Sequence, residues 1–401
     1  MRDLEKKARG YALKNAIAYD GKAQQGAVIS ALFNEGLKKE DIKKYGKKIS
    51  EIVAEVNKLS LEEQKKEFET IEKTLSKRVE REGLPELPDV KKSGVVMRIA
   101  PSASGPLHIG HAIVSSLNLI YVHKYGGKFY VRIEDTNPDN VYPNAYEMIE
   151  KESKWLSKDL AEVVVQSDRM DLYYKYAEEL IEKEKAYVCE CDPDDFRELI
   201  KKQKPCRCRD SIVEENKEKW KKMFNEYRPG GAVLRFKSNL KDKNPAMRDF
   251  PLARINETEH PRQGKKYRVW PLMNLAVAVD DMEMKMTHII RGKDHRDNAL
   301  RQEMIFKVFK KKYPWKAFFG RYHFKGMVLS TTQFREGVES GKYSGWDDPK
   351  LPTIASLMKK YKPEAFWKMA EHIGLSEVDK TFDKKEFFRL LDEFNKDSVE
   401  E

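Results

Sequence analysis

Hydrophobic and polar positions follow two different periods along this chain, and the change falls near residue 95. Up to about residue 85 the apolar positions recur at helical spacing. This holds for AIAYDGKAQQGAVISALFNEG (16–36), which ends on Gly36, and for SEIVAEVNKL (50–59), where Ser50 is the expected N-cap. The stretch EGLPELPDVKKSG (82–94) carries two prolines and two glycines and is typical of a linker. The pattern predicts an N-terminal helical region, then a connection.

From residue 95 the pattern predicts a strand, a helix and a second strand. VVMRIA (95–100) is a short apolar strand, and PSASGPLHIGHA (101–112) is a turn that enters a helix ending at Gly126. KFYVRIED (128–135) is the next strand. Such a unit predicts parallel strands joined by a right-handed crossover. Ligands on parallel sheets bind at the carboxyl ends of the strands, where this turn lies.

The second half of the chain continues the pattern after an interruption at residues 187–262. The interruption holds many charges and one strand candidate, AVLRFK (232–237). VWPLMNLAVAVDD (269–281) and THIIRGKDH (287–295) are then predicted as buried strands of the same sheet. Short helices are expected beyond residue 326, one of them centred on PEAFWKMAEHIG (363–374). The fold class is therefore α/β.

Composition adds a charge argument. Charged residues make up 36% of the 401, the net charge is +11, and the 40% of hydrophobic residues suffices for folded cores. An excess of cations favours a nucleic-acid partner, although a lysine-rich solvated surface explains it equally well. MRDLEKKARG (1–10) has no apolar core, and the longest apolar run, MNLAVAV (273–279), is too short for a bilayer. We expect a cytoplasmic protein without membrane contact.

Two histidines mark the turn after the first predicted strand. His108 and His111 lie three residues apart at the start of a helix, so they share a face. Gly105 and Gly110 let the backbone approach a ligand closely. Exposed N–H groups and two imidazoles suit phosphate. From the residues alone, a phosphate site, half of a metal site and an ordinary surface remain equally open.

All four cysteines lie within one 20-residue stretch, CECDPDDFRELIKKQKPCRC (189–208). Two C-x-C pairs separated by a short helix can place four thiolates in a tetrahedron, as in structural zinc sites. Buried thiols without a metal are the alternative. Several cations surround the cysteines and suit phosphate contact, or form a solvated face: Lys201, Lys202, Lys204, Arg207 and Arg209.

Five ordered stretches resemble the glutamyl-tRNA synthetases of the archaeal and eukaryotic branch, which are class I aminoacyl-tRNA synthetases. The resemblance runs from about residue 5 to about residue 390. It is carried by RIAPSASGPLHIGHA (98–112), VRIEDTNP (131–138), YRVWPLMNLAVAVDD (267–281), HIIRGKDHRDN (288–298) and GKYSGWDDPKLPT (341–353). The first of these contains the His-Ile-Gly-His signature of the class.

The resemblance implies an architecture. It predicts a Rossmann-type parallel sheet with an insertion that binds the tRNA acceptor end, between an N-terminal helical domain and a C-terminal helical connector. The expected boundaries are 1–91 for the helical domain, 92–186 and 263–325 for the two Rossmann halves, 187–262 for the insertion, and 326–401 for the signature loop and connector. A zinc knuckle lies in the corresponding insertion of the family, which favours zinc on Cys189, Cys191, Cys206 and Cys208.

The resemblance also implies a reaction and roles for residues. The expected activity is a glutamate–tRNA ligase that makes glutamyl-adenylate from L-glutamate and ATP with Mg²⁺. It then transfers the acyl group to the 3′ end of tRNA, most directly tRNA-Glu, and acts as a monomer. Catalytic roles fall on His108, His111, Ser330 and Thr331. Amino-acid contacts fall on Arg98, Ser102, Glu134 and Arg291, and ATP contacts on Gly105, His108, Gly110, His111, Asp294, His295, Val328 and Leu329. Asp280 and Asp281 are expected to be structural.

The chain departs from the family at its second signature. That loop usually carries a lysine that steadies the pyrophosphate, whereas VLSTTQ (328–333) contains no cation. We expect weakened rather than abolished activity, with Lys325 or Arg335 as substitutes. Ala103 replaces a usual proline. Lys285 replaces a commoner glycine, and we have no account of it.

The family's anticodon-binding barrels are absent from these 401 residues. The sequence is therefore expected to be either a piece of a longer protein or a naturally short form. A short form resembles paralogs that glutamylate a modified tRNA base. A catalytically impaired protein that binds tRNA or adenylate, and an enzyme for glutamine, are further alternatives. The two arginines, Arg98 and Arg291, favour glutamate, because a guanidinium pairs with a carboxylate.

Overall fold

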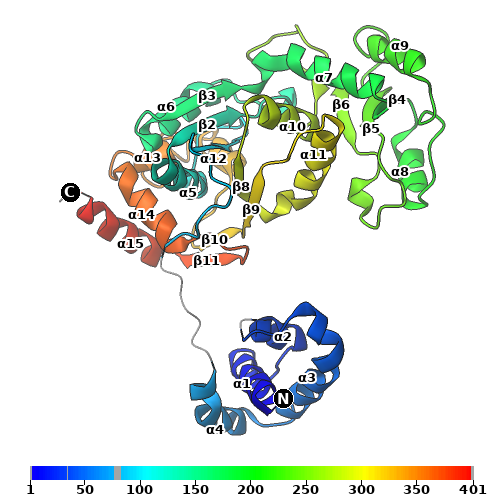
Figure 1. Ribbon diagram of the computed structural model, residues 1–401. Helices are drawn as coiled ribbons and strands as arrows, with labels where there is room; N and C mark the ends of the chain where they lie inside the picture. Colours follow the sequence, from blue (N-terminus) through cyan, green and yellow to red (C-terminus); the bar gives the residue numbers. More distant parts are fainter. Residues whose placement is uncertain (1, 34, 76–82, 399–401) are drawn as a thin grey trace. The chain divides into compact units, whose positions relative to one another are not determined.

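The computed structural model describes residues 2–33, 35–75 and 83–398. The chain forms two compact units, residues 1–82 and residues 83–401 (Figure 1). Among the described residues, no helix is long and apolar enough to cross a bilayer.

The first unit is helical, as the pattern predicts. It consists of α1 (Arg2–Ala18), α2 (Gln25–Phe33), α3 (Ile42–Val56) and α4 (Leu61–Ile71), with short 3-10 turns at Lys39–Asp41 and Glu72–Thr74. Small and branched apolar side chains fill its core, among them Ala12, Leu13, Val28, Leu32 and Val56.

Two details of the helical prediction are wrong. The stretch 16–36 is not one helix, because the chain turns at Asp20 and Gly21, which have φ of 49° and 84°. Ser50 lies inside α3, which already begins after Asp41. The capping residue of this unit is Ser60, which forms a reciprocal capping box with Glu63 at the start of α4.

The second unit is built on parallel strands. β1 (Val95–Ile99), β2 (Gly127–Ile133) and β3 (Ala161–Val165) form one sheet in that order, and β8 (His288–Gly292) pairs in parallel with β9 (Trp315–Phe319). The two sheets meet where Thr287 N donates to Val96 O at 3.0 Å. The predicted unit of two parallel strands and a helix is confirmed.

Helices cover this sheet (Figure 1). α5 (Ile109–Tyr125) connects β1 to β2, begins at His108 and ends at Gly126 (φ 72°), as expected. The other elements of this unit outside the insertion are α6 (Ala145–Ser157), α7 (Met170–Glu182), α10 (Met273–Glu283), α11 (Arg296–Val308), α12 (Thr331–Glu339), α13 (Ile354–Leu357), α14 (Pro363–Ile373) and α15 (Lys384–Asp397), with β10 (Tyr322–Lys325) paired to β11 (Lys380–Asp383) and 3-10 turns at Pro138–Asn140, Gln166–Arg169 and Lys293–His295.

The interrupting segment and the residues just after it form a separate sheet. β4 (Ala186–Cys189), β5 (Val233–Phe236), β6 (Pro251–Ile255) and β7 (Val269–Pro271) are antiparallel, and the segment also contains α8 (Pro193–Lys201), α9 (Val213–Met223) and a 3-10 turn at Pro245–Met247. The prediction that 269–281 is a strand of the parallel sheet is therefore wrong. Its first three residues form β7 and the rest is the buried helix α10, because a short apolar run suits a buried helix as well as a strand.

The stretch 83–94 is more than a connection. Leu87 is 7% exposed and belongs to the core of the second unit, with Leu84 and Val90 packed beside it. The Tyr121 hydroxyl donates to Pro85 O at 2.8 Å. The described part of the expected linker is therefore packed onto the sheet-bearing unit.

Candidate active site and cysteine cluster

A cavity of about 210 Å³ opens at the carboxyl ends of β1, β2 and β8. β8 lies beside β1 but comes much later in the chain, so this is a switch point in strand order, where ligands bind on parallel sheets. The cavity brings together five residues that the sequence placed in the site, and other residues complete its wall: Arg98, His111, Glu134, Arg291 and His295, with Ile99, Ala100, Pro101, Val114, Ile290, Gly292 and Phe319.

The two histidines of the first signature are held as a pair by the start of α5. Gly110 N donates to His108 Nδ1 at 3.1 Å, and His108 N donates to His111 Nδ1 at 3.2 Å. The ring centroids are 3.9 Å apart. Because both Nδ1 atoms accept hydrogen bonds, each neutral ring carries its proton on Nε2.

Desolvation keeps both rings neutral. Burial lowers the pKa of His111 to about 4, and burial together with the neighbouring His111 lowers the pKa of His108 well below its ordinary value. Near neutral pH the pair therefore offers two Nε2–H donors and no net charge. It can accept positive charge only as negative charge develops nearby.

A cluster of buried charges holds Arg98 in the wall of the cavity. Arg98 donates through Nε and Nη2 to the two oxygens of Asp281, at 3.1 and 3.0 Å. Arg132, with no exposed surface, donates to the same carboxylate at 2.6 Å. Burial raises the pKa of Asp281, but the two arginines outweigh it and hold that pKa at about 2. The expected structural role of Asp281 fits this geometry, because it fixes the guanidinium of Arg98.

Arg291 and Glu134 face the same cavity with unused bonding capacity. Arg291 Nη1 donates to Gln302 Oε1 at 2.9 Å, but its buried Nε has no hydrogen-bond partner among the described residues. The side chain of Glu134 is 18% exposed and its nearest cation, Arg132, is 3.4 Å away. Burial raises the pKa of Glu134, and the adjacent Arg132, Arg98 and Arg291 oppose that rise. The cavity thus presents a free anion-binding donor and a carboxylate.

The second-signature stretch lies directly on the first. Ser330 is the N-cap of α12, and its Oγ accepts from Gln333 N at 3.4 Å. The side chains of Leu329 and Thr331 pack against Gly110 and Gly105. The stretch is thus both a serine-capped helix start and a cover on the histidine turn.

Two cations flank the second-signature stretch and have no ion-pair partner among the described residues. Lys325 is exposed and Arg335 partly buried, and neither forms an ion pair with the described residues. Gln333 is exposed. Val328 is 56% exposed, so it lies at the surface.

Two other predicted residues sit at the edge of the site. Asp294 lies outside the cavity lining, and its half-exposed carboxylate accepts from Arg321 at 3.3 Å. Ser102 is exposed and forms an isolated bridge with Glu134 at the end of β2. His295 lines the cavity, and burial, with a contribution from Arg291, lowers its pKa.

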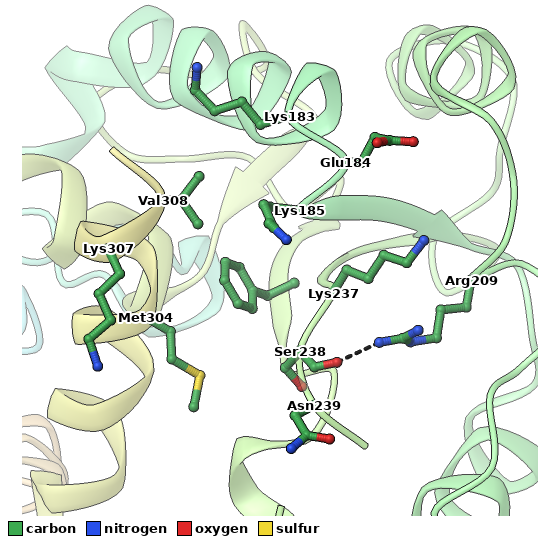
Figure 2. A pocket seen from close by; sticks show the side chains of 11 residues that line it. Lys183, Glu184, Lys185, Arg209, Lys237, Ser238, Asn239, Met304, Lys307 and Val308 are labelled. Carbon is green, nitrogen blue, oxygen red and sulfur yellow. Dashed lines mark hydrogen bonds between the residues drawn. The ribbon is translucent and has the colours of Figure 1, made fainter. Parts of the chain in front are cut away.

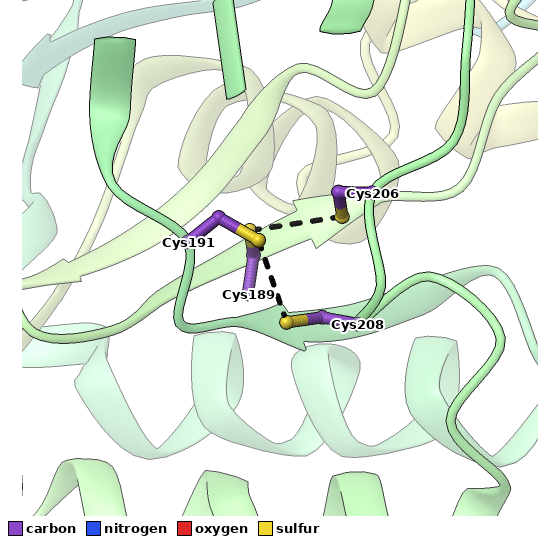
Figure 3. Close-up of side chains that lie close together, drawn as sticks. All are labelled: Cys189, Cys191, Cys206 and Cys208. Atoms are coloured by element: carbon purple, nitrogen blue, oxygen red, sulfur yellow. Dashed lines mark hydrogen bonds between the residues drawn. The ribbon is translucent and has the colours of Figure 1, made fainter. Parts of the chain in front are cut away.

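The four cysteines lie together in the interrupting segment (Figure 3). Their sulfurs are all within 4.8 Å of one another, with Cys189 to Cys206 at 4.0 Å and Cys191 to Cys208 at 3.7 Å. Four thiolates at about 2.3 Å from a tetrahedral zinc are roughly 3.8 Å apart, so the spacing fits this ion. Glu190 N also donates to Cys208 Sγ at 3.4 Å, the kind of support that stabilises a thiolate ligand.

Comparison with known proteins identifies the family. Residues 94–401 match the family described as tRNA synthetases class I (E and Q), catalytic domain. The chain belongs to this family. The glutamate–tRNA ligase of Methanocaldococcus jannaschii is 45% identical over 389 residues, 96% of this chain and 70% of that protein. The glutamate–tRNA ligase of Pyrococcus furiosus is 45% identical over 394 residues, 94% of this chain and 68% of that protein.

Solved structures also resemble this class I synthetase. A glutamate tRNA ligase from Elizabethkingia meningosepticum, crystallised in complex with its amino acid, is 25% identical with a TM-score of 0.48. The match covers 69% of this chain and 60% of that one.

Sequence reasoning missed several residues that shape the synthetase site. Arg132 was not predicted, although it stands two residues before Glu134 on β2 and therefore points to the same face. Gln302, the acceptor for Arg291, carries no comparable signal, because it comes from the middle of α11.

The sequence also gives no indication of Glu152 on α6, another residue that shapes the site. This buried carboxylate accepts from Leu107 N at 2.6 Å and from Ala355 N at 3.2 Å. It thereby ties the first-signature turn of the synthetase to α13, and burial raises its pKa to about 8 against those two hydrogen bonds. Nothing in the sequence around residue 152 distinguishes it from other helical glutamates.

Proposed function

We propose that this chain activates L-glutamate with ATP and transfers it to the 3′ end of tRNA. The observation that carries the proposal is the cavity of about 210 Å³ that Arg98, Arg291 and Glu134 line together with His111, one of the two neutral histidines. Both relatives described above are named glutamate–tRNA ligases. ATP enters as a substrate with Mg²⁺.

The charges of the cavity suit glutamate. Arg291 Nε is a buried donor with no partner among the described residues, and Arg98 is held in place by Asp281. A side-chain carboxylate supplies what these donors lack, in the charge-assisted geometry that guanidinium favours. Glu134 faces the substrate ammonium, and this positive charge offsets the cost of burying the Glu134 carboxylate.

The same donors argue against glutamine. A guanidinium has no acceptor, so an amide NH₂ of glutamine that faced Arg98 and Arg291 would meet only donors. A site built to bond one group rejects an analogue that leaves its buried polar atoms unpaired.

The histidine pair acts at the phosphate. When the glutamate α-carboxylate attacks the α-phosphorus, negative charge grows on the phosphate oxygens while pyrophosphate leaves. The Nε2–H groups of His108 and His111 are preorganised by their Nδ1 contacts at 3.1 and 3.2 Å to donate to those oxygens. Donors fixed before the reaction stabilise charge without reorganisation.

The second-signature stretch covers this reaction centre without a lysine. Ser330 and Thr331 offer hydroxyls, and the N-terminal N–H groups of α12 offer further donors. A missing charge-assisted contact costs about 2.7–4 kcal/mol in such a transition state. Activation is therefore slowed, with Lys325 or Arg335, the cations closest in sequence, as substitutes.

The segment 187–262 receives the tRNA acceptor end. Lys201, Lys202 and Lys204 are exposed on and after α8, beside the cysteine cluster. Zinc, held by the four cysteines, fixes the loop that carries Arg207 and Arg209 and plays no part in the chemistry.

Pyrophosphate exchange tests the proposal. Exchange is measured with glutamate and with glutamine, each with and without tRNA, followed by charging of unmodified tRNA-Glu. Exchange with glutamate and charging of tRNA-Glu support the ligase. Exchange without charging points to a paralog with another acceptor, and ATP binding without exchange points to an impaired binding protein.

A further inference from the structure

A second and larger cavity, of about 630 Å³, lies away from the proposed active site. Its walls come from the turn after α7, the end of β5 and the last turns of α11. α11 starts beside His295 of the active site, and a helix of its 13 residues is roughly 20 Å long. The two cavities therefore lie at opposite ends of one helix.

Cations dominate the rim of this cavity. Five basic side chains face one carboxylate, whereas the whole chain has 77 basic and 66 acidic residues: Lys183, Lys185, Arg209, Lys237 and Lys307, with Glu184. Arg209 is fixed by Asp249 at 2.8 Å. Figure 2 shows Lys307 and Met304 on one wall and Arg209 and Lys237 on the opposite side.

Two of these lysines have no structural explanation. Lys183 and Lys307 stand at the ends of α7 and α11, where cations complement the helix dipole. Lys185 and Lys237 do not stand at helix ends, and neither makes an ion pair with the described residues. Lys237 N donates to Lys185 O at 2.7 Å, which places the two opposite each other just beyond the paired ends of the antiparallel strands β4 and β5. Like charges in that arrangement repel, and an anion between them removes the repulsion.

The remaining lining is polar at Ser238 and Asn239 and apolar elsewhere. Met304 and Val308 line the wall on α11, and Phe236 lines it from β5. A cationic rim beside an apolar wall suits a ligand that carries both a phosphate and a ring. We propose that this cavity binds a nucleotide, either free or as one residue of an RNA strand, with Lys185 and Lys237 on its phosphate.

The test compares a double charge reversal, Lys185→Glu with Lys237→Glu, against a matched control, Lys175→Glu with Lys221→Glu. The control lysines are exposed, lie on α7 and α9, and make no ion pair with the described residues. Adenosine monophosphate binding is measured by equilibrium dialysis, and binding of a uridine decamer by fluorescence anisotropy at fixed salt. Melting curves and pyrophosphate exchange show that each variant is folded.

We expect the reversal to remove one adenosine monophosphate site per chain, or to weaken decamer binding at least about tenfold, because each charge-assisted contact contributes that much. Loss of the mononucleotide site alone identifies a free nucleotide, and loss of decamer affinity identifies RNA. The control retains both. If neither probe distinguishes the reversal from the control, the proposal is wrong. The comparison does not depend on what the active site binds.

Discussion

Thr331 lies against Gly105, so the two signature segments are in contact. A Cβ on Gly105 would come within 2.5 Å of Thr331 Cγ2, and the backbone of Gly105 has a φ of 153°. The approach is possible because glycine has no side chain. The turn that presents His108 therefore depends on the position of the segment that covers it.

Gly105→Ala should slow activation on the order of tenfold. The methyl group must displace Thr331, and the backbone is strained by about 1–3 kcal/mol. Pyrophosphate exchange measures the effect. Adding Thr331→Ser removes the clashing methyl group and should restore part of the rate, whereas Gly26→Ala, where a Cβ has nothing within 4 Å, should leave it unchanged. An unaffected Gly105→Ala enzyme would show that the contact plays no role.

Gln333→Lys should raise the exchange rate by up to about 10²–10³. This is the usual change in rate when one hydrogen-bond donor to a developing oxyanion is gained or lost. Gln333 is exposed in the first turn of α12, so a lysine fits without steric cost. Gln333→Met, of similar length and no charge, is the control. A lysine variant no faster than the methionine variant would mean that Lys325 or Arg335 already acts, or that the stretch takes no part.

Asp281→Asn should destabilise the protein by about 3–5 kcal/mol, because the buried Arg98 would lose its counter-ion and the buried Arg132 would lose the closest of its carboxylates. The pKa of Asp281 is lowered to about 2. Its contribution is therefore present above its unfolded value of 3.8 and is lost as the pH falls through about 2. Denaturant unfolding at pH 3 and pH 7 measures both effects.

The matched control for that variant is Asp347→Asn, which removes an exposed carboxylate paired with Lys359. Its stability should stay close to that of the parent, since exposed pairs contribute little. Equal losses in the two variants would contradict the buried-network account.

The sequence predicts secondary-structure elements more reliably than it predicts which side chains pack together. Local patterns sufficed for β1, α5 and β2, because the strand–turn–helix signal and Gly126 are read within about 30 residues. They failed at 269–281, where only the surroundings decide between strand and helix. In the cavity, His111 and Glu134 follow from motifs. Glu152 and Gln302, which support the site from outside the cavity, do not follow from motifs, since their partners Leu107 and Arg291 are distant or come from another element.

Glu152→Gln should change how stability depends on pH. Burial raises the pKa of Glu152 to about 8, from 4.5, so the folded protein holds a proton that the unfolded chain releases earlier. Its stabilising contribution is complete below pH 4.5 and is lost as the pH rises through about 8. Relative to the variant, the parent should lose on the order of 3 kcal/mol between pH 5 and pH 8. Parallel pH curves for the two proteins would rule this out.

The variant should also loosen the signature turn. A glutamine oxygen can still accept from Leu107 N, but its NH₂ would then face Ala355 N, donor to donor. The Michaelis constant for ATP should therefore rise even at pH 5, where the pH-dependent difference in stability between the parent and the variant is smallest. Glu150→Gln, which removes an exposed partner of Lys154 on the same helix, should change neither property.

Zinc removal should destabilise the insertion and expose its thiols together. The chain has four cysteines and all belong to the cluster, so a thiol reagent reports on the cluster alone. As purified, the protein should contain about one zinc per chain and react slowly; after chelation, all four thiols should react and the melting temperature should fall. Cys206→Ser should lower the zinc content in the same way. Less than a quarter equivalent of zinc, with four thiols that react no faster after chelation, would leave the cysteines as buried, unligated side chains.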